Sequence, residues 1–225
     1  MKKGTRFTTA LSGAALIMAV FASVALAAVI TGTPRGERLT GTSDADEISA
    51  RGGNDRVIAR GGDDRVQGGR GADRVRGGDG NDTIEAGGGR DLVSAGAGDD
   101  VSRGGGGDDR IFANLGVDET FGGDGNDDLW ALARGDVSGP DDQTGDTLHG
   151  EGGDDTFHLR DGEVDKVDCG AGTDVALLDT VDVIVDASSA NQNGSCERVE
   201  RRDAGDRDDA PENARQSPSE DRRQG

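Results

Sequence analysis

The most regular feature of the chain is an aliphatic residue that recurs every nine positions between polar, glycine-rich segments. One aliphatic side chain between two outward-facing neighbours is the pattern of a very short strand with a single buried position. We therefore predict strands of three residues, joined by turns of six residues. The aliphatic positions are Ile48, Val57, Val66, Val75, Ile84, Val93, Ile111 and Leu129.

The six-residue segments between these strands are rich in Gly, Asn and Asp, which are turn residues. From Val57 onward a glycine stands four positions before each aliphatic residue, as at Gly53 and Gly80, where it allows a positive φ. A fixed short period of this kind indicates a repeat architecture. Two nonapeptides make one coil of 18 residues, and successive coils stack at about 4.8 Å, the spacing of paired strands.

An aspartate precedes each aliphatic position by two residues, so the coil sorts the aspartates onto two edges. Stacked carboxylates repel one another unless a counter-ion lies between them, and carboxylate and carbonyl oxygens suit Ca²⁺ better than Mg²⁺. One edge holds Asp46, Asp64, Asp82, Asp100, Asp118 and Asp136, and the other holds Asp55, Asp73, Asp91, Asp109 and Asp127.

The cleanest copy of the repeat is GGDGNDTIE at residues 77–85, and GGDGNDDLW at residues 122–130 matches it closely. The pattern resembles the RTX (haemolysin-type) calcium-binding repeat, G-G-x-G-x-D-x-U-x. The resemblance covers residues 32–130 in near-continuous register and residues 141–177 less regularly. It implies an all-β fold, a right-handed parallel β-roll (β-solenoid), with several Ca²⁺ ions held between stacked turns.

The resemblance also implies which residues bind the metal. The aspartates supply side-chain oxygens, and residues at the first and third positions of the turn supply carbonyl oxygens. The implied ligands are Asp46, Asp55, Asp64, Asp73, Asp82, Asp91, Asp100, Asp109, Asp118 and Asp127, with Gly68, Gly77, Gly104 and Gly122.

The copies are unequal, and two alternatives to calcium are open. The best site is expected between Asp109 and Asp127, and sites that use Asp118 should be weak because that copy lacks both opening glycines. Arg51 and Arg60 replace the second glycine, so a roll held by Asp–Arg pairs is one alternative, although exposed pairs contribute only about 0–1 kcal/mol each. An EF-hand is the other alternative. It is disfavoured because its loop needs Gly at the sixth position, where the candidate loops carry an aliphatic residue.

The N-terminus has the form of a secretory signal peptide. Residues 1–6 are basic, residues 14–28 are apolar, and residues 25–27 (ALA) form a small-x-small cleavage site. A membrane anchor is the weaker interpretation, because the apolar run is short and ends at this site. We predict a signal peptide at residues 1–27 and a secreted, extracellular protein.

Composition agrees with a charged, weakly apolar repeat protein. The net charge is −20, and loss of residues 1–27 removes three positive charges, which leaves about −23. This charge disfavours nucleic acid and anionic membranes as partners and favours cations. With one Trp, no Tyr and 40 Gly, the chain cannot build a conventional globular core.

The C-terminal third departs from the repeat. We predict a regular roll over residues 28–138, degenerate repeats and a C-terminal cap over residues 139–200, and a disordered polar tail over residues 201–225. Cys169 and Cys196 are the only cysteines, and an even pair in an exported chain predicts a disulfide. Trp130 is expected to face outward and to cover the neighbouring loop.

No catalytic constellation stands out, so we expect a binding protein and not an enzyme. His149 and His158 are the only histidines, and successive half-coils should place them on opposite edges. The second functional class is an extracellular structural or adhesive protein that uses the roll as a spacer and contacts the cell envelope or matrix. Outward positions carry no regular array that would favour this class.

Overall fold

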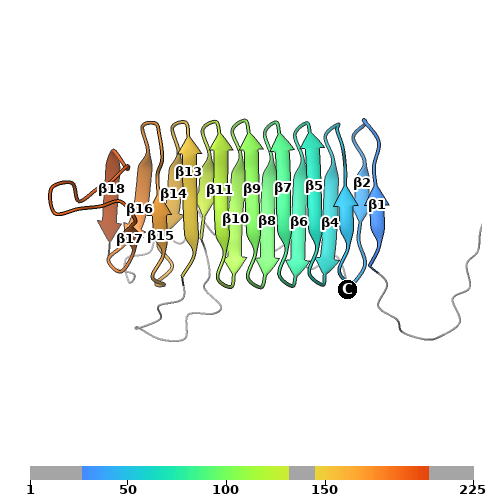
Figure 1. The fold of residues 1–225 in the computed structure, drawn as a ribbon, viewed down its shortest axis with the longest axis horizontal. Coiled ribbons are helices and arrows are strands. Elements are labelled where there is room, and N and C mark those ends of the chain that lie inside the picture. Colours follow the sequence, from blue (N-terminus) through green and yellow to red (C-terminus); the bar gives the residue numbers. More distant parts are fainter. Residues whose placement is uncertain (1–26, 132–144, 203–225) are drawn as a thin grey trace, which may run out of the picture.

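The computed structural model describes residues 27–131 and 145–202, and every named element in these ranges is a β-strand. The strands form two parallel sheets of nine strands each, to which the chain contributes alternately (Figure 1). Within these ranges the structure contains no apolar helix of membrane-spanning length. The molecule is therefore the parallel β-solenoid that the sequence predicts.

The odd-numbered strands make one sheet in sequence order, and the even-numbered strands make the other. The first sheet contains β1 (Val29–Thr31), β3 (Glu47–Ser49), β5 (Arg65–Arg70), β7 (Thr83–Gly88), β9 (Val101–Gly106), β11 (Glu119–Asp124), β13 (Thr147–Gly152), β15 (Lys166–Asp168) and β17 (Val183–Ile184). The second contains β2 (Arg38–Thr40), β4 (Arg56–Gly61), β6 (Arg74–Asp79), β8 (Leu92–Ala97), β10 (Arg110–Leu115), β12 (Asp128–Trp130), β14 (Thr156–Leu159), β16 (Val175–Asp179) and β18 (Arg198–Arg202).

Neighbouring strands pair with a shift of 18 residues, which stacks the aliphatic positions on one another. Val66 pairs with Ile84 in the first sheet, and Val75 pairs with Val93 in the second. All eight aliphatic side chains of the repeat are at most 3% exposed and belong to one core. In β9 and β11 the same inward position carries Ser102 and Thr120, which pair with each other and are also buried.

Half of the strands, including all from β4 to β11, are six residues long, so the prediction of three-residue strands was wrong for the regular part of the roll. After Ile84 the chain stays extended through Gly88, and Gly87 and Gly88 pair with Gly105 and Gly106 of the next coil. This extension buries a second inward residue per repeat, such as Ala86 at 0% exposure. The first position of the nonapeptide is therefore small because it faces the narrow interior of the coil.

The predicted break in register is real, but the sheets continue across it. Thr120 pairs with Leu148, a step of 28 residues, and Leu148 pairs with Val167 after a step of 19. The start of the predicted degenerate region, residues 139–144, falls outside the described residues. Extra residues are thus accommodated between strands without loss of pairing.

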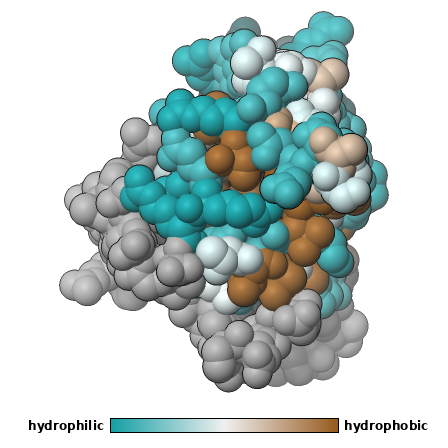
Figure 2. Space-filling model, turned by 90° about the vertical axis from the view of Figure 1, so that its left-hand side faces the viewer, coloured by the Kyte–Doolittle hydropathy of each residue, from teal (hydrophilic) through white to brown (hydrophobic). Residues whose placement is uncertain are grey.

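A separate C-terminal cap is not confirmed. The apolar stretches expected in it form β16 and β17, which extend the two sheets, and β18 pairs with β16 through Arg202. The roll therefore passes the predicted boundaries at residues 138 and 201, and the predicted tail lies mainly in the range that the structure does not describe. Apolar surface is visible at this end of the molecule (Figure 2), where Val181, Val183 and Val185 are 40–55% exposed.

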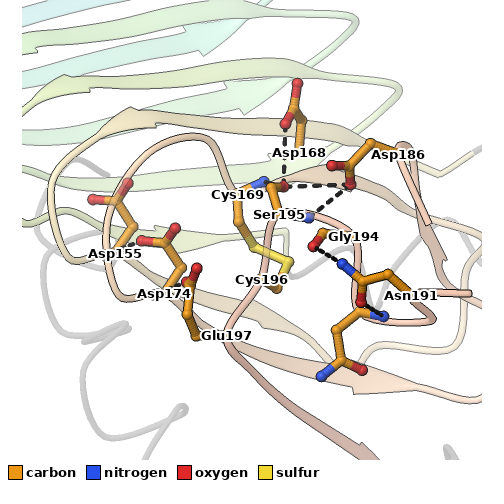
Figure 3. Close-up of a disulfide and its surroundings, with 11 residues drawn as sticks. Asp155, Asp168, Cys169, Asp174, Asp186, Asn191, Gly194, Ser195, Cys196 and Glu197 are labelled. Carbon is orange, nitrogen blue, oxygen red and sulfur yellow. Dashed lines mark hydrogen bonds between the residues drawn. A yellow bond between two sulfur atoms is a disulfide. The ribbon is translucent and has the colours of Figure 1, made fainter. Parts of the chain in front are cut away.

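The disulfide joins this last part of the chain to the roll. Cys169 follows β15 and is bonded to Cys196, which precedes β18, with their Cα atoms 5.2 Å apart (Figure 3). Both cysteines are buried in the core. The Ser195 hydroxyl accepts a hydrogen bond from the Cys169 amide, which fixes the segment further.

In the turns that begin between residues 50 and 122, and in the turn at residues 150–155, two positions adopt a positive φ. The fourth position is always glycine, from Gly53 to Gly125 and again at Gly153. The second position is usually glycine, but Arg51, Arg60, Asn114 and Glu151 adopt a positive φ there. A non-glycine residue in this region is strained by about 1–3 kcal/mol. The four substituted turns are therefore less stable than their glycine counterparts.

The adjacent residues Gly106 and Gly107 test whether glycine is required where φ is positive. Gly107, at the fourth position, has φ of 119°, and an added Cβ would overlap the carbonyl oxygen of Gly89. Gly106 has no atom within 4 Å of an added Cβ. We expect Gly107→Ala to lower the free energy of unfolding by at least about 1–3 kcal/mol, and Gly106→Ala to change it by less than about 0.5 kcal/mol. Denaturant titration in calcium measures both, and equal effects would contradict the argument.

Candidate metal centre

The aspartates form two continuous columns, one along each edge of the roll. In each column the carboxylate Oδ1 accepts a hydrogen bond from the backbone amide of the equivalent aspartate one coil earlier, at 2.6–2.8 Å. The aspartate side chains are 0–5% exposed, whereas Glu197 at the end of the second column is exposed. The first column is Asp46, Asp64, Asp82, Asp100, Asp118, Asp146, Asp165 and Asp182, and the second is Asp55, Asp73, Asp91, Asp109, Asp127, Asp155, Asp174 and Glu197.

The columns confirm the two predicted edges up to the break in register and extend beyond it. The Asp118 amide donates to Asp146, so Asp146 takes the place predicted for Asp136, which lies outside the described residues. The ligand prediction stopped at Asp127 and so omitted the later members of both columns. The sequence signal for these members was the spacing of nine or ten residues between Asp146, Asp155, Asp165 and Asp174.

The second carboxylate oxygen of most column members has no hydrogen-bond donor although it is buried. This holds for Asp55, Asp64, Asp73, Asp82, Asp91, Asp100, Asp109, Asp127, Asp146, Asp155, Asp165 and Asp174. An unsatisfied buried polar group costs about 1–3 kcal/mol, and more when it is charged. A row of such oxygens has the chemistry of a cation site.

Carboxylate and carbonyl oxygens converge at the first position of the turn. An added Cβ on Gly104 would meet Asp109 Oδ2 and the carbonyl oxygen of Gly122. Gly77 is placed in the same way beside Asp82 and the carbonyl of Ala95. Gly68 lies beside Asp73, and Gly122 lies beside Asp127. All four glycines predicted as ligands therefore line the columns, and this all-oxygen donor set fits Ca²⁺.

Burial and mutual repulsion raise the pKa values of many of the column carboxyls, including Asp82, Asp100 and Asp109. Desolvation, and then the charges of Asp64, Asp63 and Asp79, raise the pKa of Asp82 to about 7. Desolvation is also the main cause for Asp100, whose pKa is about 8, and for Asp109, whose pKa is about 7. Without a cation, the columns thus compete for protons near neutral pH.

Asp46 differs from the other predicted ligands, because protein donors satisfy both of its oxygens. Its Oδ1 accepts from the Ala28 amide at 2.7 Å, and its Oδ2 accepts from the Thr42 amide at 2.6 Å. Thr33 makes the same contact with Glu37 one half-coil earlier. Threonine at the second turn position of the copies at residues 32–40 and 41–49 was the sequence signal for this difference. The first copies therefore have less need of a cation than the later ones.

The structure does not support arginines as the neutralising groups. Arg65 pairs with Glu85, and Arg110 pairs with Asp128, so these cations engage outward-facing carboxylates. The inward Oδ2 atoms of Asp64 and Asp109 in the same coils have no hydrogen-bond donor. The Asp–Arg alternative therefore leaves the columns unexplained.

The histidines lie on different sheets, as expected. His149 in β13 stacks on Phe121, and His158 in β14 stacks on Trp130 with ring centroids 3.5 Å apart. Trp130 is only 2% exposed, and its Nε1 donates to Asp128. The loop it was expected to cover lies in residues 132–144, outside the described ranges.

Asp109→Asn is expected to change stability in opposite directions with and without calcium. In chelator the variant removes a buried charge from a repelling column and should raise the free energy of unfolding by about 1–3 kcal/mol. In calcium it removes a charged ligand and should lower the melting temperature relative to the unaltered chain. The control is Asp108→Asn, an exposed carboxylate paired with Arg90. The interpretation fails if Asp109→Asn has the same sign in both conditions.

The raised pKa values predict the pH dependence of the metal-free roll. A carboxyl whose folded pKa exceeds its unfolded value of 3.8 stabilises the fold when protonated, and this stability is lost as pH rises through the folded value. The free energy of unfolding in chelator should therefore fall between about pH 4 and pH 8, given pKa values of about 6 for Asp64, 7 for Asp82 and 8 for Asp100. In saturating calcium it should not fall over this range. The β-signal in circular dichroism, followed across this pH range in chelator and in calcium, measures both trends.

Comparison with known proteins agrees with this geometry. The family model of the RTX calcium-binding nonapeptide repeat matches residues 31–66, 58–93, 67–102, 94–129 and 143–163, which together make up more than half of the chain. A comparison with curated proteins found no match. The matched ranges contain the turns that carry the columns up to Asp155, so the chain belongs to the RTX calcium-binding nonapeptide repeat family.

Proposed function

We propose that the protein is a secreted calcium-binding protein whose β-roll folds when Ca²⁺ binds between stacked turns. The observation that carries the proposal is the pair of columns of buried carboxylate oxygens without donors. Where the first position of the turn is glycine, as at Gly77 and Gly104, this oxygen lies beside it together with a carbonyl oxygen of the next coil. Bound calcium would supply the positive charge that these oxygens lack.

Coupling between binding and folding follows from how the ligands are assembled. The carboxylate of Asp109 and the carbonyl of Gly122 meet only when the two coils are stacked, so the site does not exist in an extended chain. Binding free energy at a site that forms only on folding contributes to folding stability. The 40 glycines increase the entropy lost on ordering and so make this contribution necessary.

Export is supported by the position of the first strand. The predicted cleavage after Ala27 leaves β1 whole, because β1 begins at Val29. Ala28 remains in the mature chain, and its amide is the donor to Asp46. We propose that the protein acts outside the cell, where calcium is abundant, and that it acts by binding and not by catalysis. In support of a binding role, the same arrangement of groups recurs along both edges.

Circular dichroism of the mature chain, residues 28–225, tests the proposal. In chelator we expect a largely disordered spectrum, and calcium at millimolar concentration should produce the β-signal. Magnesium at the same concentration should have a much smaller effect, because Mg²⁺ requires stricter octahedral geometry and retains its water. A chain that is equally folded in chelator and in calcium would refute the coupling. An equal response to magnesium would refute the selectivity.

A further inference from the structure

The turn between β14 and β15 does not follow the nonapeptide pattern. Residues 160–165 read RDGEVD, so carboxylates occupy the second and fourth positions where the other turns usually have glycine. The positive φ moves to the third position, where Gly162 has φ of 107°. The match to the repeat family ends at residue 163, inside this turn. The repeat therefore does not account for the residues found here.

The carboxylates of this turn point into the molecule. Asp161, Glu163 and Asp165 are 0–1% exposed, and one carboxylate oxygen from each lies within 4.8 Å of the others. The Glu163 amide donates to Asp161 Oδ1 at 3.1 Å, which holds these two residues in a tight turn. Three acidic side chains thus share one interior space.

A second observation points independently to a ligand. Asp165 Oδ2 is fully buried and has no hydrogen-bond donor, and the same is true of Asp146 Oδ2 in the preceding coil. Asp146 adjoins the cluster, since its amide donates to Asp165 Oδ1 at 2.7 Å. Desolvation, and then the charges of Asp118, Asp161 and Glu163, raise the pKa of Asp146 to about 9.

The groups packed around the cluster are mostly acidic or engaged elsewhere. In the following coil, Asp182 accepts hydrogen bonds from the amides of Asp165 and Asp179. Arg160 donates to the main-chain carbonyl of Glu200, and Arg201 donates to main-chain carbonyls of Asp179 and Asp182. Lys166 is exposed on β15. Among these contacts, Arg160 and Arg201 donate to main-chain carbonyls and not to Asp165 or Asp146.

We propose that Asp146, Asp161, Glu163 and Asp165 form a calcium site of a second kind, built from side-chain carboxylates. A repeat turn offers its aspartate and main-chain carbonyls, whereas this turn adds two carboxylates of its own. Calcium affinity rises with the number of charged ligands. This site therefore binds Ca²⁺ more tightly than the repeat turns and fills first. The proposal rests on the proposed function, because Asp146 and Asp165 also belong to the first column and meet only when the coils are stacked.

Direct calcium binding to the mature chain tests the proposal, with equilibrium dialysis to count ions and a competing chelator to measure affinity. We expect Glu163→Gln to weaken the tightest class of ions by at least tenfold. The double variant Asp161→Asn/Glu163→Gln should lose one tight ion per chain. Glu163→Asp, which keeps the charge, should retain that ion. Glu119→Gln is the matched control, because Glu119 is an exposed glutamate on β11. The proposal is overturned if the double variant keeps the ion count and tight affinity of the unaltered chain.

Circular dichroism of each variant in saturating calcium distinguishes loss of binding through misfolding from loss of binding through removal of a ligand. If the double variant lacks the β-signal, the dialysis result of Glu163→Gln alone tests the proposal. This change only replaces one carboxylate oxygen by a neutral NH2 group. Asp109→Asn separates this proposal from the repeat sites. Loss of an ion in Asp109→Asn, with no change in Glu163→Gln, would sustain the repeat sites and refute the second site. If the chain binds a single tight ion that is lost only in Glu163→Gln, the second site is supported and the repeat sites are refuted.

Discussion

The structure depends on the stacking of like charges one strand spacing apart. Because the regular coils repeat after 18 residues, their stacking places Asp82 between Asp64 and Asp100, to which amide-to-carboxylate hydrogen bonds link it. In most of the column, as at Asp64, Asp82 and Asp100, one carboxylate oxygen accepts the amide of a neighbouring aspartate, which fixes the side chain inward, and the other oxygen is left buried without a donor. The bonds that build the roll therefore also create its electrostatic cost, and only protons or cations can offset this cost.

Glycine permits this arrangement in two different ways. At the fourth turn position, as at Gly107, the backbone adopts a positive φ and approaches the carbonyl of the preceding coil too closely for a Cβ. At the first position, as at Gly104, the absence of a side chain leaves room for the carboxylate oxygen of Asp109 and the carbonyl of Gly122. The same composition that weakens the metal-free fold through chain entropy is thus required to bring the oxygens together.

The nonapeptide period was sufficient to predict the coil, the parallel sheets and the two aspartate edges, because each follows from one repeated spacing. It could not predict strand length, since Ala86 and its equivalents carry no strong strand preference and are buried only because the sheets continue. The replacement of Asp136 by Asp146 depends on where pairing resumes after an insertion, which spacing alone does not determine. The inward turn of Asp161 and Glu163 depends on the positive φ of Gly162, which the disrupted pattern did not reveal.

At most ends of the columns, protein groups donate hydrogen bonds to both carboxylate oxygens, and most members inside the columns lack one of these donors. At the N-terminal end, Thr42 satisfies Asp46, and Thr33 satisfies both oxygens of Glu37. At the C-terminal end, Asp182 accepts amides at both of its oxygens. Glu197, beside the disulfide, accepts the Asp174 amide and completes the other column (Figure 3). Protein donors are therefore available to this fold where a turn is irregular. The regular turns present only carbonyl oxygens to the second carboxylate oxygen, so their demand for a cation follows from the repeat itself.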